Sequence, residues 1–328
     1  MSTQLPQAVA QQLHLPVIVA PMFLISSPKM VIESCKAGLI GSFPLLNART
    51  ADELDEWMQH ITDALFVAKN KEPEQKIAPW AVNLIVHHSN KRFETDLALI
   101  MKHKPPIVIT SLGDPQPIVD VVHQYGGLVF SDVSTLKHAQ KAAQRGVDGL
   151  ILVCSGAGGH AGTINPFAFM AEVKKTWQGI TILAGSISNG QDILAAKVLG
   201  ADLAYMGTRF IATTESFAHD DYQTMLIDST LDDLIYTDAI SGVKGNYLIP
   251  SIRNAGLDPA KLNKKDNVDF SQLNATNAKA WKNIWSAGQG LGAIQHVATV
   301  TLVAEELKQQ YKEALDALQM ENISKNQN

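Results

Sequence analysis

Short apolar runs rich in β-branched residues recur along the first two thirds of the chain and alternate with longer amphipathic stretches. Eight of these runs are predicted strands, at 17–20, 39–43, 81–85, 107–110, 128–131, 150–153, 181–184 and 203–206. Most are nearly continuous in apolar residues rather than alternating. That pattern is typical of strands that helices bury on both faces of a parallel sheet.

The stretches between these runs carry helix signals. Residues 51–68 repeat apolar positions at helical spacing, 134–145 begin with capping hydroxyls and end before Gly146, and 189–199 begin with Asn189 and end at Gly200. Eight strands alternating with helices favour an α/β fold, a closed (β/α)8 TIM barrel. An open doubly wound sheet is the alternative, but its GxGxxG signal after the first strand is absent.

The pattern changes after Arg209. Residues 213–285 are polar, contain acidic clusters and show no further strand signal, which predicts a small helical lid subdomain over one end of the barrel. Helical periodicity returns at 294–318, which we expect to be the last barrel helix. The predicted organisation is therefore a barrel domain from 1–212 and 286–328, with the lid at 213–285 inserted before the last helix.

Composition narrows the class of protein. The chain has 328 residues, 46% of them hydrophobic, and a net charge of −5, which gives no electrostatic reason to expect nucleic acid or an anionic membrane as a partner. The two cysteines lack a CxxC spacing, the N-terminus lacks a signal-peptide pattern, and no apolar run approaches the ~18–20 residues of a membrane span. We expect a cytoplasmic monomer or homodimer.

The residues that follow the strands are the ones that carry chemistry, because active sites of such barrels lie at the carboxyl ends of the strands. Small residues follow the last two predicted strands, in Ala184-Gly185-Ser186 and Met206-Gly207-Thr208. Free backbone N–H groups in such turns bind phosphate, and this architecture often has a phosphate site there. For either segment taken singly, an ordinary tight turn is the alternative.

A glycine-rich loop, GAGGHAG, follows the sixth predicted strand and contains His160. Glycines allow a backbone to approach a planar ligand closely, and a histidine in that place is a candidate general base. The alternative is a surface histidine in a flexible loop. The sequence contains no HxxxH or other metal-ligand spacing and no GxSxG elbow, so we expect neither a metal site nor a serine triad.

Taken together and in this order, these motifs resemble the nitronate monooxygenases, formerly called 2-nitropropane dioxygenases. The resemblance rests on Ala-Pro-Met at 20–22, Asn83 in the third strand, AGGHxG at 157–162, AGSI at 184–187 and MGTRF at 206–210. A further similarity lies at 285–290, WSAGQG. The family has an FMN-containing barrel with a helical lid, and the pattern of the chain predicts the same arrangement of barrel and lid.

The resemblance implies a role for each matching residue. Ala20, Pro21 and Met22 would lie along the flavin ring, with Asn83 near its polar edge or the substrate, and Gly158 and Gly159 would lie beside FMN. His160 would be the catalytic base. Ala184, Gly185, Ser186, Met206, Gly207 and Thr208 would bind the cofactor at its phosphate side, and Gln289 with Trp285 would close the site from the lid.

The resemblance also implies a reaction: FMN-dependent oxidation of alkyl nitronates by O2 to a carbonyl compound and nitrite, with neutral nitroalkanes as further candidate substrates. The chain departs from the family pattern at 153–156, which read Val-Cys-Ser-Gly where better-known members carry Gln-Gly-x-Glu. Two alternatives therefore stay open. One is an FMN-dependent NAD(P)H:quinone or enoyl reductase, and the other is a barrel that binds a phosphate ligand without catalysis.

Overall fold

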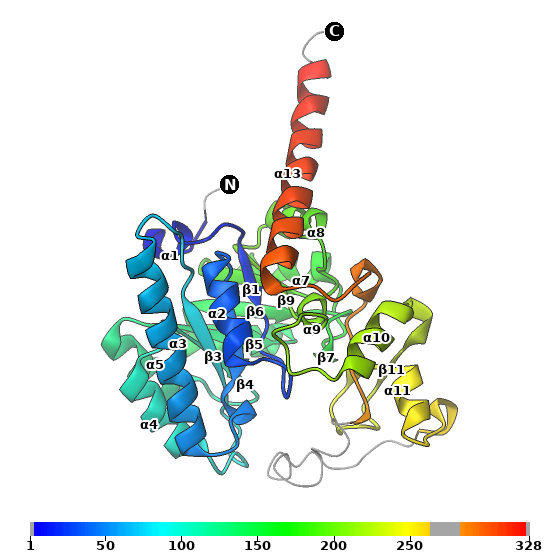
Figure 1. The fold of residues 1–328 in the computed structure, drawn as a ribbon, viewed down its shortest axis with the longest axis horizontal. Coiled ribbons are helices and arrows are strands. Elements are labelled where there is room, and N and C mark those ends of the chain that lie inside the picture. The colour runs from blue at the N-terminus through cyan, green and yellow to red at the C-terminus, as the bar shows by residue number, and fades with distance from the viewer. Residues whose placement is uncertain (1–2, 263–282, 326–328) are drawn as a thin grey trace.

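A parallel eight-stranded sheet forms the centre of the protein, shown in Figure 1 as a computed structural model that describes residues 3–262 and 283–325. Its strands are β1 (Val17–Val19), β2 (Gly41–Pro44), β3 (Trp80–Ile85), β4 (Ile107–Ser111), β5 (Leu128–Val133), β6 (Gly149–Val153), β8 (Ile180–Ala184) and β9 (Leu203–Met206). All eight predicted strands are therefore present within a few residues of their expected bounds.

The sheet closes on itself. Its strand order is β1-β9-β8-β6-β5-β4-β3-β2, every pairing is parallel, and a bridge between Ile18 and Ile40 joins the two ends. The fold is a (β/α)8 barrel, which confirms the predicted fold class. The alternative of an open doubly wound sheet is wrong, because the edge strands of such a sheet would not meet.

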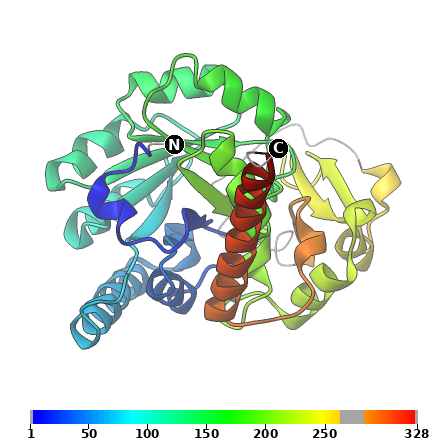
Figure 2. The ribbon, with the colours of Figure 1, turned by 90° about the horizontal axis from the view of Figure 1, so that it is seen from above.

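Helices surround the barrel (Figure 2). They are α2 (Pro28–Lys36), α3 (Ala51–Lys71), α4 (Phe93–His103), α5 (Gln116–Val122), α6 (Leu136–Gln144), α7 (Pro166–Val173), α8 (Gly190–Val198) and α13 (Val300–Lys325). The last helix, α13, packs against α8 and α2, so it fills the remaining place in the ring, and its C-terminal half projects beyond the barrel (Figure 1).

Two helix ends show how the sequence positions the strands. Gly146 and Gly200 follow α6 and α8 with φ of 78° and 102°, the left-handed conformation that glycine adopts without strain. Two residues later, Asp148 Oδ2 accepts a hydrogen bond from Val129 N (2.7 Å), and Asp202 Oδ2 accepts one from Thr181 N (2.9 Å). Each turn therefore ends a helix and ties the next strand to its neighbour.

The hydrophobic core has two layers. One fills the barrel interior with residues such as Ile18, Ile107 and Phe130, and the short helix α1 (Gln7–Ala10) and its flanking Leu5 and Leu13 extend this layer. The other layer lies between sheet and helices. Burial on both faces explains the continuous apolar runs of the strands.

The region from 213 to 285, expected to be helical, is of mixed structure in its described part. It contains α10 (Asp220–Asp228) and α11 (Ile249–Asn254), but also the strands β10 (Leu234–Thr237) and β11 (Gly245–Leu248). These two strands form an antiparallel sheet with β7 (Gly159–His160). The expectation that no strand follows Arg209 is therefore wrong. The sequence pattern does not indicate β10 and β11 because each has only four residues and lacks a long apolar run.

This second sheet is separate from the barrel, and no described residue of 213–285 adds a strand to the eight-stranded sheet. Residues 263–282 of the expected lid, and 1–2 and 326–328 of the expected barrel segments, lie outside the described residues. The boundaries of the lid stay a prediction. No helix of the described residues is both long and apolar enough to cross a membrane.

Candidate functional site

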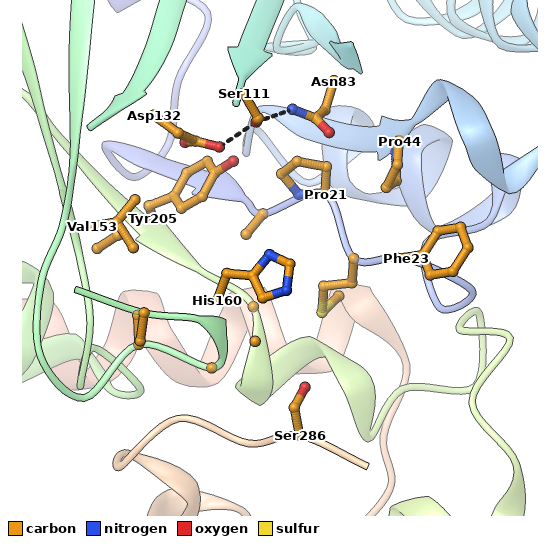
Figure 3. A pocket seen from close by; sticks show the side chains of 18 of the residues that line it. Pro21, Phe23, Pro44, Asn83, Ser111, Asp132, Val153, His160, Tyr205 and Ser286 are labelled. Carbon is orange, nitrogen blue, oxygen red and sulfur yellow. Dashed lines mark hydrogen bonds between the residues drawn. The ribbon is translucent and has the colours of Figure 1, made fainter. Parts of the chain in front are cut away.

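A cavity of about 1620 Å³ opens at the carboxyl ends of the barrel strands and extends beneath the small sheet of the lid region. Residues at or just after the ends of all eight barrel strands line it, as does the glycine-rich loop. Figure 3 shows the part of this cavity around His160. The location is the one at which barrels of this architecture carry their active sites.

The rim after β8 and β9 presents unpaired backbone donors. Ser186 has a φ of 57° and Gly185 a φ of 120°, so the chain turns sharply after β8. Among the described residues, no acceptor bonds the backbone N–H groups of Ser186, Gly207 or Thr208. Donors from two adjacent strand ends that converge on one cavity rim fit an anionic group such as a phosphate.

Glycine is required where the loop after β6 meets this rim. A Cβ on Gly158 would lie 2.9 Å from Gly288 N and 3.0 Å from Thr208 Oγ1, too close for a side chain. Gly288 N itself donates a hydrogen bond to Thr208 Oγ1 (2.9 Å), and Gln289 N donates one to Gly156 O (2.8 Å). The segment 286–290 therefore fixes the loop and the β9 turn together.

The ring of His160 points into the cavity from β7 (Figure 3). Its Nε2 lies 3.2 Å from Ser241 Oγ, which also accepts a hydrogen bond from Tyr247 OH (2.9 Å) and donates one to Val243 O (2.9 Å). In the tautomer that donates Nε2–H to Ser241 Oγ, the ring lone pair lies on Nδ1.

Burial lowers the pKa of His160 to about 4, since a charged imidazolium loses solvation in this cavity. The imidazole is therefore neutral at pH 7 and able to accept a proton.

Three hydrogen-bonded polar side chains, Asn83, Ser111 and Asp132, line the cavity beside Tyr205 (Figure 3). Asn83 Nδ2 donates to Ser111 Oγ (2.7 Å), and Ser111 Oγ donates to Asp132 Oδ2 (2.6 Å). Burial raises the pKa of Asp132 to about 6, and the Ser111 hydroxyl opposes this shift. Burial, and then the Asp132 charge, also raises the pKa of Tyr205, so its phenol stays neutral.

Most residues predicted for the site line the cavity: Ala20, Pro21, Met22, Asn83, Gly158, Gly159, His160, Ala184, Gly185, Ser186, Gly207 and Thr208, with Trp285 on the lid side. Two predicted residues do not. Met206 is fully buried in the core, where its carbonyl accepts from Ala20 N (2.9 Å), and Gln289 is exposed, with its side chain close to Gly156.

Sequence reasoning missed Ser111, Asp132 and Ser241. The first two follow the fourth and fifth apolar runs, so an acid at the carboxyl end of a buried strand was a usable signal. Ser241 lies 81 residues from His160 in the chain, and no spacing rule connects them. Among the described residues, no group of three or more His, Cys, Asp and Glu side chains could hold a metal ion.

A profile of the nitronate monooxygenase family matches residues 7–310. The chain belongs to the nitronate monooxygenase family. It is therefore an oxidoreductase that acts on a small-molecule substrate, and the resemblance carried by the strand-end motifs is confirmed.

Individual nitronate monooxygenases are distant in sequence but similar in length. The chain is 25% identical to the nitronate monooxygenase of Paraburkholderia phytofirmans over 345 residues, covering 92% of this chain and 94% of that protein. It is 24% identical to the nitronate monooxygenase of Neurospora crassa, covering 93% and 91%.

Solved structures show the same fold. A nitroalkane oxidase from Streptomyces ansochromogenes superposes with a TM-score of 0.80 at 22% identity, over 95% of this chain and 100% of that one. FabK from Thermotoga maritima superposes with a TM-score of 0.75 at 20% identity, over 96% and 99%. At these identities the superpositions establish the architecture alone.

Proposed function

We propose that the protein binds FMN and oxidises alkyl nitronates with O2, and that His160 is the base when the substrate is a neutral nitroalkane. One observation carries the proposal: a single cavity joins a neutral histidine ring to unpaired backbone N–H groups at two neighbouring strand ends. Membership of the nitronate monooxygenase family supports the same reaction.

The residues present fit the phosphate of FMN. The N–H groups of Ser186, Gly207 and Thr208 would donate to it, and Gly185 and Gly158 allow the chain to approach closely. The sequence lacks a dinucleotide fingerprint, which favours FMN over FAD.

The flavin ring would lie among Ala20, Pro21 and Met22 on one side and Ala184 and Gly159 on the other, with Asn83 beyond it. Met206 would support this site from the core, and Gln289 from its position beside Gly156. A bound flavin supplies the electron acceptor for the nitronate and passes the electrons to O2, and the products are a carbonyl compound and nitrite.

His160 has a defined task for a neutral nitroalkane. Nδ1 would take the proton from the carbon that bears the nitro group, while Nε2 stays bonded to Ser241 Oγ, which holds the ring in place. A preformed nitronate has already lost this proton and needs no base. We also propose that the described part of the lid region, residues 213–262 and 283–285, opens and closes over the cavity.

The test has two steps. Purified protein should be yellow and release FMN on denaturation; release of FAD, or no flavin after reconstitution, contradicts the cofactor assignment. Anaerobic mixing should then bleach the flavin quickly with a nitronate and slowly or not at all with NADH or NADPH. Rapid bleaching by a pyridine nucleotide instead makes the protein a reductase.

The reductase remains the second candidate because of one feature of the cavity. Its volume of about 1620 Å³ exceeds the ~300–1,000 Å³ usual for a small-ligand site, so it has room for a second ligand beside a flavin. The anaerobic experiment detects whether NAD(P)H is that ligand.

A further inference from the structure

Asp132 carries a buried oxygen that lacks a partner. Among the described residues, three buried side-chain atoms make no hydrogen bond: Asp96 Oδ2, Asp132 Oδ1 and Arg209 Nη1. Of these three residues, only Asp132 lines the cavity. A buried acceptor without a donor is costly, so an oxygen in this place indicates a ligand that donates to it.

The hydrogen bonds of the residues beside Asp132 determine which atoms of this group can accept a hydrogen bond from a ligand. Asn83 Nδ2 donates to Ile109 O (3.3 Å) and to Ser111 Oγ (2.7 Å), so the carbonyl oxygen of this amide is left for the cavity. The Ser111 proton goes to Asp132 Oδ2 (2.6 Å). The chain of hydrogen bonds therefore ends in two acceptors, Asn83 Oδ1 and Asp132 Oδ1.

The position of these two acceptors in the barrel determines which part of a bound ligand lies beside them. In the closed strand order, β3 and β4 lie opposite β8 and β9, whose turns carry the unpaired N–H groups, and β5 is next to β4. A molecule with its phosphate at the β8–β9 rim and its ring across the barrel would therefore place the far edge of that ring beside Asp132.

We propose that Asp132, held by Ser111 and Asn83, binds the N–H group of the flavin pyrimidine ring. This inference rests on the proposed function. The pyrimidine edge has one N–H between two carbonyl groups, whereas the opposite edge of the ring carries only methyl groups. Asp132 Oδ1 can accept a hydrogen bond from the single N–H of the first edge, and the second edge offers no donor. At neutral pH a carboxylate accepts a charge-assisted hydrogen bond, which is stronger than a neutral one.

The proposal predicts changes in three properties of the flavin: its affinity, its midpoint potential and the pKa of its ring N–H. Asp132→Asn removes the charge and one acceptor, so FMN should bind roughly 10–100-fold more weakly. The same change should raise the flavin midpoint potential, because a carboxylate beside the ring opposes the uptake of electrons. It should also lower the pKa of the ring N–H, since the carboxylate holds that proton in the wild type.

The experiment titrates apoprotein with FMN, follows the flavin absorbance at alkaline pH and measures the potential by dye equilibration. Asp114→Asn is the matched control, because Asp114 borders the same cavity but pairs with Arg145 at its exposed mouth. Ser111→Ala should reproduce the changes of Asp132→Asn in the same direction and at smaller size. Circular dichroism establishes that each variant is folded.

Distinct results overturn the inference and the proposed function. Wild-type protein that binds no flavin overturns both. Wild type that binds FMN, while folded Asp132→Asn keeps the same affinity, potential and N–H pKa, overturns the inference alone. A variant in which only the KM for the nitronate rises shows that Asp132 binds the substrate, which also contradicts the inference.

Discussion

The acid limb of the pH profile is a direct test of His160 as a base. Burial sets the pKa of this imidazole at about 4, against the usual ~6.5, so about one ring in a thousand is protonated at pH 7. The reactive, neutral form therefore predominates well into the acid range. For a neutral nitroalkane, kcat/KM should stay level down to about pH 5 and fall with a midpoint near 4.

Replacing the ring should separate the two kinds of substrate. His160→Asn removes the base, and loss of general-base catalysis typically costs ~10²–10⁴-fold, so kcat/KM for the neutral nitroalkane should fall by that factor. Activity on the preformed nitronate should fall much less, because no proton is removed. Flavin content should be unchanged, since backbone N–H groups bind the cofactor.

The assay is initial-rate oxygen consumption from pH 3 to 8 with each substrate, and His138→Asn is the control because His138 lines the same cavity at an exposed position. An acid limb near pH 6.5 would refute the assignment of a buried base. Full turnover of the neutral nitroalkane by flavin-loaded His160→Asn would refute any proton transfer to this residue.

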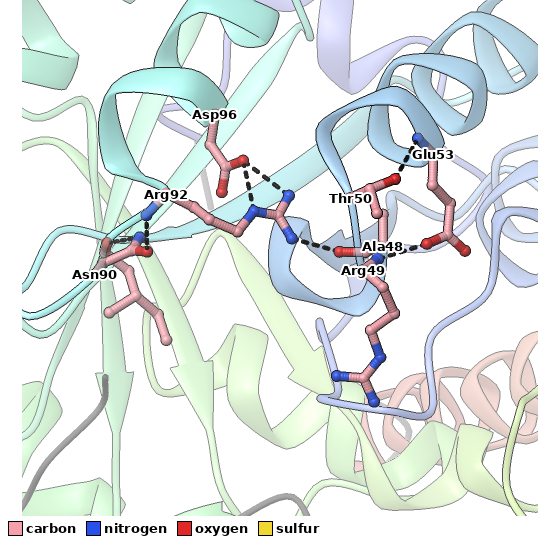
Figure 4. A network of polar contacts seen from close by, with 8 residues as sticks. Ala48, Arg49, Thr50, Glu53, Asn90, Arg92 and Asp96 are labelled. Carbon is pink, nitrogen blue, oxygen red and sulfur yellow. Dashed lines mark hydrogen bonds and ion pairs between the residues drawn. The ribbon is translucent and has the colours of Figure 1, made fainter. Parts of the chain in front are cut away.

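Two further substitutions test the supports of the site. Ser241→Ala removes the Oγ that lies 3.2 Å from His160 Nε2. The kcat/KM for the nitroalkane should then fall ~2–10-fold and the acid limb of its pH profile should move, while nitronate turnover is unchanged. A pH profile that does not move contradicts this role of Ser241. Arg92→Met leaves the buried Asp96 charge unpaired beneath the β2 loop (Figure 4) and should cost ~3–5 kcal/mol in urea unfolding. Because burial raises the pKa of Asp96, this loss should shrink as the pH is lowered; a pH-independent loss contradicts it.

The barrel was predictable from the sequence because its signals are local. Strands buried on both faces must be continuously apolar, and Gly146 and Gly200 end helices in a conformation that other residues rarely adopt. The site residues at strand ends were predictable for the same reason: once the strands are located, the fold brings their carboxyl ends together.

The lid strands and Ser241 were not predictable in this way. β10 is partly exposed along its length, so it has no continuous apolar run, and β11 is only four residues long. The strand β7, which holds His160, exists only because β11 pairs with it. A two-residue strand has no sequence signal of its own, because its hydrogen bonds depend on a distant segment.

That pairing bears on how the lid can move. His160 pairs with Gly245 in the small sheet, Ala161 N donates to Lys244 O (3.1 Å), and Asn246 Nδ2 donates to Ala157 O (2.7 Å). These bonds tie the lid strand to both sides of the catalytic candidate. Opening of the lid must then either break them or carry the glycine-rich loop along. The second course keeps these three bonds but acts against the contacts that hold the loop to residues 286–290, such as the bond from Gln289 N to Gly156 O (2.8 Å). In that course His160 would move together with the lid strand.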